Sequence, residues 1–200
     1  MTETFDFNQN LILEDDVVLL RPLQRSDATN LLDISENEPD TWQYSLVRAD
    51  GRANLENYID IAIKAREGQT EFPFIVFDKK SNKYAGSTRF YDINFSFKTV
   101  QIGYTWYGKD FCGTGMNKHI KYLLLSYAFE KLEMQRVEFR ADNNNVRSIA
   151  AMKSIGCKVD GILRNNMPTF GSDLRRDSIV LSILREEWFA MVKENLQSKL

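Results

Sequence analysis

Gly113 and Gly115, separated only by Thr114, are the residues of this chain whose spacing first suggests chemistry. They follow a segment, Gln101–Tyr107, that is rich in the aromatic and β-branched residues typical of a strand. They precede a segment with helical periodicity that begins at Met116. A glycine turn of this kind leaves backbone N–H groups unpaired at the positive end of the helix dipole. Such a turn is suited to binding phosphate.

Two common phosphate-binding motifs are excluded by residue identity. Gly108 and Gly113 have the outer spacing of a nucleoside-triphosphate loop, but Thr114 stands where that loop needs its lysine. Gly113 and Gly115 begin a dinucleotide fingerprint, yet Lys118 occupies the position of the third glycine. From these residues alone, an ordinary tight turn stays open as the alternative to a phosphate site.

Composition and charge exclude several classes of protein. The 200 residues are 43% hydrophobic and 27% charged, which is typical of a globular protein, and 13 Phe, 8 Tyr and 3 Trp supply a core of real size. A net charge of −2 gives no footprint for nucleic acid or an anionic membrane. Cys112 and Cys157 lack metal-ligand spacing, so we expect reduced thiols and no metal site. The N-terminus carries no secretory signal and no apolar window spans a bilayer, so we expect a cytoplasmic protein.

The periodicity of the chain predicts the elements that must position the glycine turn. Residues 1–14 are expected to form a mobile or loosely docked arm of a single domain that spans residues 1–200. The strands expected within residues 72–107 are joined by short links, which implies an antiparallel meander. The strand–helix–strand order that follows indicates an α+β or mixed α/β fold. The expected strands are Asp16–Leu20, Phe72–Phe77, Tyr84–Tyr91, Thr99–Tyr107, Gln135–Ala141, Cys157–Leu163 and Arg176–Leu184. The expected helices are Ala28–Ile34, Ala53–Glu67, Met116–Leu132, a helix through Ile155 that is capped by Asn143, Asn144 or Asn145, and Arg185–Gln197.

Six segments, in this order and spacing, resemble the GNAT superfamily of N-acetyltransferases, and in particular its Rim-type branch, which acetylates the N-termini of ribosomal proteins. The segments are DVVLLRPLQRSDATNLLDI, YAGSTRFYDI, IGYTW, GTGMNKHIKYLLLSYAFEKL, RVEFRADNNNVRSIAAMKSIGCKVDGILR and RRDSIVLSILREEW. The resemblance covers nearly the whole chain. It implies a GNAT-like fold, with a mostly antiparallel central sheet of about seven strands that is splayed in the middle and flanked by helices.

The resemblance implies acetyl-CoA as the cofactor and group donor. Its pyrophosphate would lie on the backbone of Cys112–Met116, and its pantetheine arm would pass between the strand ending at Tyr107 and the strand ending at Ala141. One position departs from the family's Gln/Arg-x-x-Gly-x-Gly/Ala pattern, because Asp110 stands where Gln or Arg is expected. An acid there would weaken pyrophosphate binding if it faced the ligand. The expected cofactor-binding residues are Tyr104, Thr105, Trp106, Cys112, Gly113, Thr114, Gly115, Met116, Asn117, Asn145 and Ser148.

The implied reaction is direct attack of a primary amine on the thioester, with a small molecule or a peptide or protein N-terminus as the acceptor. Asn145 reads both as a helix N-cap and, by resemblance, as a pantetheine ligand, and Ser148 is a candidate proton donor to the thiolate. The base stays unassigned. Met167 falls where some relatives carry Glu, and Asp142, Glu138, Tyr104 or a water chain are the alternatives. We expect His119, with its neighbours Lys118 and Lys121, on the solvated face of the long helix.

Three functions remain after this reading. The first is an acetyl-CoA-dependent N-acetyltransferase, active as a monomer or homodimer. The second, motivated by Asp110 and Met167, is a non-catalytic acyl-CoA-binding or regulatory domain. The third is an unrelated α/β binding module in which the glycine turn is coincidental. The acceptor side of the site is expected in residues 30–58 and 164–172, which carry no readable motif.

Overall fold

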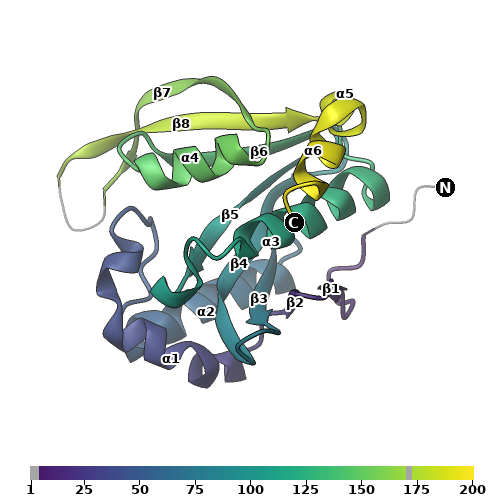
Figure 1. The fold of residues 1–200 in the computed structure, drawn as a ribbon. Helices are drawn as coiled ribbons and strands as arrows, with labels where there is room; N and C mark the ends of the chain where they lie inside the picture. The colour runs from purple at the N-terminus through teal and green to yellow at the C-terminus, as the bar shows by residue number, and fades with distance from the viewer. Residues whose placement is uncertain (1–4, 170–172) are drawn as a thin grey trace.

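A single open sheet organises the protein, with helices on both of its faces (Figure 1). The computed structural model describes residues 5–169 and 173–200. The strand order is β1-β2-β3-β4-β5-β6-β8-β7, and every neighbouring pair is antiparallel except β5 with β6. The predicted mixed α/β fold is confirmed, with eight strands instead of about seven. The strands are β1 (Leu13–Glu14), β2 (Val18–Pro22), β3 (Phe72–Asp78), β4 (Lys83–Asn94), β5 (Thr99–Tyr107), β6 (Arg136–Asp142), β7 (Lys158–Pro168) and β8 (Arg175–Leu184).

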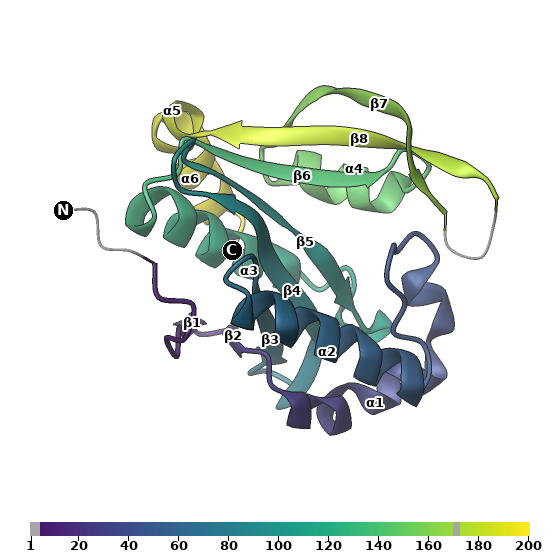
Figure 2. The same ribbon diagram turned by 180° about the vertical axis from the view of Figure 1, so that it is seen from behind.

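The helices divide between the two faces of the sheet. Helices α1 and α2 cover one face, and α3, α4 and α6 lie on the other (Figures 1 and 2). The long helix predicted after the glycine turn is α3 continued by a π-helical turn, Tyr127–Lys131, and the predicted last helix is α5 and α6 joined by a second π turn, Trp188–Val192. The helices are α1 (Ala28–Asn37), α2 (Arg52–Glu67), α3 (Met116–Ser126), α4 (Val146–Ser154), α5 (Arg185–Glu187) and α6 (Lys193–Gln197).

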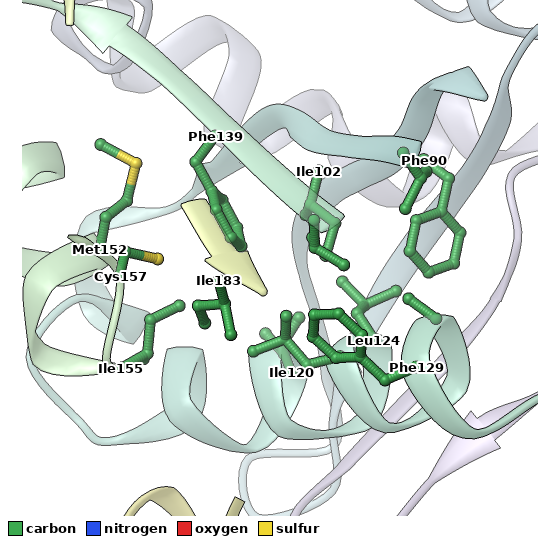
Figure 3. Close-up of a cluster of buried hydrophobic side chains, with 14 of the residues drawn as sticks. Phe90, Ile102, Ile120, Leu124, Phe129, Phe139, Met152, Ile155, Cys157 and Ile183 are labelled. Atoms are coloured by element: carbon green, nitrogen blue, oxygen red, sulfur yellow. The ribbon is translucent and has the colours of Figure 1, made fainter. Parts of the chain in front are cut away.

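Each face of the sheet has its own hydrophobic core. The larger core lies between the sheet and α3, where Ile120 and Leu124 pack with Phe90, Ile102 and Phe139 (Figure 3). The smaller core lies under α1 and α2, and Trp42, Tyr58 and Trp106 are part of it. Burial of large aromatic and aliphatic side chains on both faces is the main source of stability in such a sheet. The two cores fix β5 from both sides.

The sheet opens between β5 and β6. These two strands pair in parallel only at Thr99–Arg136, Val100–Val137 and Gln101–Glu138. Beyond these pairs the strands diverge, which Figure 2 shows as a V whose arms are β5 and β6. β6 is instead fully paired with β8 on its other edge. The predicted splaying of the sheet therefore lies between the two strands that the sequence indicated.

Residues 5–14 are packed against the body of the protein, so of the expected alternatives, a mobile or a loosely docked arm, this part is docked, while residues 1–4 of that prediction lie outside the described ranges. Phe5 and Phe7 are buried in the larger core, and the Phe5 ring contacts the Phe72 ring edge-on at 5.4 Å between centroids. The Arg66 side chain donates hydrogen bonds to the carbonyl oxygens of Phe7 and Gln9, at 2.7 and 2.8 Å. Two aromatic side chains in a polar segment are enough to dock it. In the described ranges, no helix combines the length and apolarity that a bilayer crossing needs.

Candidate active site

A cleft of about 890 Å³ occupies the opening between β5 and β6. Its walls come from β5, the glycine turn, α3, β6 and α4, and from the segment Thr41–Val47 on the other side. Tyr58 and Trp106 of the smaller core and Met152 of the larger core all line it. Because residues from both faces contribute, the cleft passes through the sheet. A molecule in it is reachable from either face.

All but one of the predicted cofactor-binding residues lie along this cleft. Met116 is the exception, because its side chain is buried in the larger core. The expected acceptor side is represented by Thr41, Tyr44, Ser45, Leu46, Val47, Tyr58 and Met167, while residues 170–172 of that prediction lie outside the described ranges. The predicted residues on the cleft are Tyr104, Thr105, Trp106, Cys112, Gly113, Thr114, Gly115, Asn117, Asn145 and Ser148.

The glycine turn is open toward the cleft. Gly113 and Gly115 have φ values of +77° and +91°, a region that side-chain-bearing residues rarely adopt. No atom lies within 4 Å of where a Cβ would stand at either position. The glycines are therefore required by the backbone conformation and not by crowding, and the space beside them is free for a ligand.

Fewer backbone N–H groups are free than the sequence suggested. The amide of Cys112 donates to the Lys109 carbonyl at 3.0 Å, and the amide of Met116 points to the Thr114 hydroxyl at 3.4 Å. Within the described chain, no hydrogen-bond partner is found for the amides of Gly113, Thr114 and Gly115. Of the amides of Cys112–Met116 that were expected to bind an anion, those of the three central residues are therefore the ones left unpaired.

Across the cleft, Asn145 begins α4. Its side-chain oxygen accepts the Ser148 backbone N–H at 3.0 Å, which is the N-cap hydrogen bond that the sequence predicted. The capping bond uses the oxygen of the Asn145 amide and leaves its NH₂ group directed elsewhere. Asn145 and Ser148 both line the cleft, so the cap and a ligand contact are compatible.

A β-bulge interrupts β5 where it lines the cleft. Ser87 pairs with Trp106 and Arg89 with Gly103, so two residues, Tyr104 and Thr105, stand opposite Thr88 alone. Tyr104 has a φ of +48°, which is strained for a residue with a large side chain. Bulges release backbone groups from the ladder. Both bulge residues line the cleft, and the Tyr104 carbonyl accepts the Tyr58 hydroxyl at 3.0 Å.

The Tyr104 ring is held as a wall of the cleft. The Arg89 guanidinium lies 4.0 Å from the ring centre, and the Tyr91 ring packs edge-on at 5.1 Å. Burial raises the pKa of the Tyr104 hydroxyl and, more strongly, those of Tyr91 and Tyr107. These phenols stay protonated at neutral pH, so Tyr104 is a poor base. Its contacts are better explained by a packing role in the wall of the cleft.

The carboxylates that the sequence offered as bases are engaged. Glu138 accepts hydrogen bonds from Arg136 at 2.9 Å and Arg140 at 2.7 Å and does not line the cleft. Asp142 lines the cleft, where its side chain accepts the Asn144 backbone N–H at 2.8 Å. Met167 also lines the cleft, and the acids that line it among the described residues are Asp92 and Asp142.

Lys121 is a cleft residue that the sequence analysis missed. It was placed with His119 on the solvated face of the helix, but its side chain is 5% exposed and lines the cleft. Its Nζ donates to the Thr105 hydroxyl at 3.0 Å, beneath the bulge of β5. Burial lowers the pKa of Lys121 from 10.5 to about 7. A lysine beside the apolar stripe of a helix is expected to be solvated, so nothing in the sequence distinguished Lys121 from the exposed lysines of the chain.

Lys118 and His119 have different surroundings than predicted, since Lys118 is half-buried and lines the cleft. His119 is half-buried, and its Nδ1 lies 2.8 Å from the Asp15 carboxylate, so it links α3 to the turn before β2 instead of facing solvent alone. Asp110 is exposed, in a short 3₁₀ turn, Lys109–Phe111, and is not a cleft residue. Its carboxylate is therefore not among the groups that line the cleft.

Comparison with known proteins now identifies the family. The acetyltransferase (GNAT) domain model matches residues 18–158. "Probable N-acetyltransferase YjcK" of Bacillus subtilis is 28% identical over 181 residues, 88% of this chain and 98% of that protein. A GCN5-related N-acetyltransferase from Brucella melitensis has the same fold with a TM-score of 0.87 and 27% identity, covering 96% of this chain and 86% of its own. Mycobacterium smegmatis RimJ, solved in complex with CoA-disulfide, shares the fold with a TM-score of 0.76 and 17% identity, over 94% and 93% of the two chains. The chain belongs to the GNAT family and is an acetyltransferase, as the order of its motifs predicted.

Proposed function

We propose that this protein transfers an acetyl group from acetyl-CoA to a primary amine by direct attack on the thioester. One observation carries the proposal. The open glycine turn lies at one end of a cleft that passes through the sheet where β5 and β6 part. A diphosphate and an extended thioester arm require these two features side by side.

The donor would lie along the α3 side of the opening. Its diphosphate fits the free amides of Gly113, Thr114 and Gly115, where the helix dipole of α3 adds positive potential. The arm would follow β5 toward the bulge, with Asn117 beside its start and Asn145 and Ser148 on the opposite wall. Membership of the GNAT family indicates that the donor is acetyl-CoA, and these residues suit its binding.

The bulge of β5 suits stabilisation of the charge that develops on the thioester oxygen. Backbone N–H groups released from a ladder at fixed positions stabilise an oxyanion without reorganising. The Tyr104–Trp106 segment offers such groups at the cleft wall. The departing thiolate is a tolerable leaving group because thiols have pKa values near 8.5. Ser148, across the cleft, is placed to pass a proton to it.

The acceptor would enter from the face covered by α1 and α2, where Thr41–Val47 and Tyr58 line the cleft. A peptide N-terminus or a small primary amine fits this description. An N-terminal amine has a pKa of about 7.7–8.0 and a lysine-like amine about 10.4, so the former needs less help in losing its proton. An N-terminal peptide is the acceptor that the chemistry favours.

The test is acceptor-dependent release of CoA. The protein is incubated with acetyl-CoA and a panel of N-terminal peptides, amino acids and polyamines, and free thiol and acetylated product are measured together. Turnover with at least one acceptor supports the proposal. Saturable CoA binding without transfer to any acceptor would instead support the non-catalytic acyl-CoA-binding function. Absence of any CoA-dependent rise in melting temperature would overturn both, because a ligand of the folded state must stabilise it.

A further inference from the structure

The cleft contains a buried lysine that the reaction described above does not use. Lys121 projects from α3, one turn after the residues beside the glycine turn, and its amine reaches the underside of the β5 bulge. Its side chain is 5% exposed, so it lies almost wholly inside the protein. A charged amine at such a depth is costly unless it is paired.

No carboxylate pairs with Lys121 among residues 5–169 and 173–200. Its hydrogen-bond partner is the neutral hydroxyl of Thr105 at 3.0 Å, and its Nζ lies 5.8 Å from the centre of the Phe139 ring. The titratable group that acts on it is the thiol of Cys157, whose own pKa burial raises to about 12. Phe139 and Cys157 belong to the larger core drawn in Figure 3. A thiol that stays neutral offers no counter-charge, so the surroundings favour the neutral amine.

One hydroxyl group, that of Thr105, connects this amine to the cleft surface at the β5 bulge. The Thr105 hydroxyl lies 2.7 Å from the Thr88 hydroxyl as well as 3.0 Å from Lys121. Thr105 is itself exposed and lines the cleft at the bulge. A proton taken up at the Thr105 oxygen can therefore pass to Lys121 without crossing apolar space.

We propose that Lys121 is the general base of the transfer, acting through the Thr105 hydroxyl on the ammonium group of the acceptor. This inference rests on the proposed function. Thr105 accepts one proton from the acceptor ammonium and gives its own to the neutral Lys121 amine. The resulting neutral amine attacks the thioester carbon, its N–C bond forms, and the C–S bond breaks. The second amine proton goes to the thiolate, and Lys121 later releases its proton to solvent.

Three tyrosines and the two carboxylates that line the cleft in the described residues do not compete for this role. Tyr91, Tyr104 and Tyr107 have raised pKa values and stay protonated. Asp92 accepts the amide NH₂ of Gln101 at 2.7 Å, and Asp142 is tied to a backbone amide as described above. Lys121, whose pKa falls to about 7, changes protonation in the range where a base for an amine is useful. It supplies what the methionine at 167 cannot.

The experiment compares Lys121→Met with wild type, with Lys153→Met as the matched control because Lys153 is exposed on α4 away from the cleft. We expect Lys121→Met to lower kcat by about 10²-fold or more, with little change in KM for acetyl-CoA and no loss of melting temperature. Wild-type kcat should rise with pH through about 7 as Lys121 loses its proton, and that limb should be absent from the variant. Lys153→Met should match wild type.

Three further measurements make the outcome decisive. Lys121→Arg keeps a charge but cannot act as a base, so it should not restore kcat, and restoration would overturn the proposal. Thr105→Val should lower kcat and Thr105→Ser should recover it. The NMR shifts of the Lys121 Cε and Nζ, assigned by their loss in Lys121→Met, should titrate near pH 7. A midpoint near 10 would also overturn the proposal. If wild type acetylates no amine, the proposed function itself fails; if wild type is active and Lys121→Met keeps its kcat and pH profile, only the role of Lys121 fails.

Discussion

At the scale of single residues, substitutions in the glycine turn test its backbone conformation and its proposed contact with CoA separately. Gly115 has a φ of +91° and open space where a Cβ would be. We expect Gly115→Ala to lower the free energy of unfolding by about 1–2 kcal/mol, because the left-handed conformation is unfavourable for alanine. It should also weaken CoA binding at least several-fold, because the strained turn withdraws its free amides. Denaturant melts and calorimetric titration with CoA measure the two effects.

Gly51 provides the control for this substitution. It has a φ of +79°, no atom within 4 Å of a Cβ, and a position at the start of α2 outside the cleft. Gly51→Ala should cost at least as much stability, because a φ of +79° with a ψ of 154° is essentially restricted to glycine, and it should leave the affinity for CoA unchanged. If both variants lost CoA affinity in proportion to stability, the turn would have no direct part in binding.

Substitutions of Asn145 can likewise separate its role as a helix cap from its proposed contact with acetyl-CoA. Its oxygen caps α4 by accepting the Ser148 N–H. Asn145→Asp keeps a capping oxygen and adds a negative charge at the helix N-terminus, so stability should stay within about 0.5 kcal/mol. It removes the NH₂ donor, so KM for acetyl-CoA should rise. Asn145→Ala should raise KM in the same way and should also lower the free energy of unfolding by about 1 kcal/mol, because it removes the cap. Steady-state kinetics and thermal melts distinguish the pair, and an unchanged KM in both would limit Asn145 to the cap.

At the scale of elements, α3 shows where the sequence was informative and where it was not. Apolar residues at Ile120 and Leu124 predicted the helix and its buried face, since burial there follows the helical period. The same pattern placed Lys121 in solvent. The buried face of the helix is wider than its stripe of apolar residues, because the β5 bulge and Phe139 also cover Lys121. A buried polar residue interrupts the pattern by which burial is predicted, so periodicity could not reveal it.

The C-terminal strands show the same limit. β7 extends to Pro168, five residues beyond the predicted end at Leu163, although most of its side chains are exposed. Backbone pairing with β8 through Met167–Arg176 and Pro168–Arg175 maintains it. Hydrophobic alternation reports one buried face, and an exposed hairpin has none. The splayed sheet, in contrast, was predicted through family resemblance, because no local pattern marks a strand that fails to pair.

One contact between elements lies on the side of the cleft where we propose that the acceptor binds. Arg176 of β8 is 9% exposed and donates to the Tyr44 carbonyl at 3.1 Å, so it ties the segment before α2 to the C-terminal strands. We expect Arg176→Met to free this segment and raise KM for the acceptor several-fold, with KM for acetyl-CoA unchanged. Proteolysis between residues 43 and 51 should accelerate. Two-substrate kinetics and limited proteolysis test this.

The neighbouring arginine is a matched control for this contact. Arg175 donates to the Asn165 and Asn166 carbonyls within its own hairpin, at 3.1 and 3.0 Å. Arg175→Met should therefore leave the segment before α2 and the acceptor KM as in wild type. Equal effects of the two variants would show that hairpin stability, and not the link to Tyr44, governs the acceptor side.

At the scale of the whole molecule, one unpaired stretch of sheet gives the protein both its cleft and an energetic cost. β5 and β6 share three residue pairs, and the two halves of the sheet are otherwise joined by α3 and by the cores on either face. Beside the opening, Lys121 is buried with no counter-charge among residues 5–169 and 173–200. Destabilising groups of this kind concentrate at functional sites.

That cost makes the stability of the protein depend on pH in a predictable direction. The pKa of Lys121 falls from 10.5 to about 7 on folding, so between these values the unfolded chain binds more protons and stability rises with pH. Below pH 7 the amine is charged in both states and the full penalty applies, on the order of 5 kcal/mol at 1.36 kcal/mol per pKa unit. Above pH 10.5 it is neutral in both states and the penalty is gone.

Lys121→Met should therefore be more stable than wild type by several kcal/mol at pH 6, with a difference that shrinks as pH approaches 10.5. The methionine loses the hydrogen bond to Thr105 and gains apolar contact, but these contributions do not vary with pH. Urea melts at pH 6, 8 and 10 measure the difference, and Lys153→Met should show none that changes with pH. A difference between Lys121→Met and wild type that stays constant across this range would mean that the buried amine keeps its ordinary pKa.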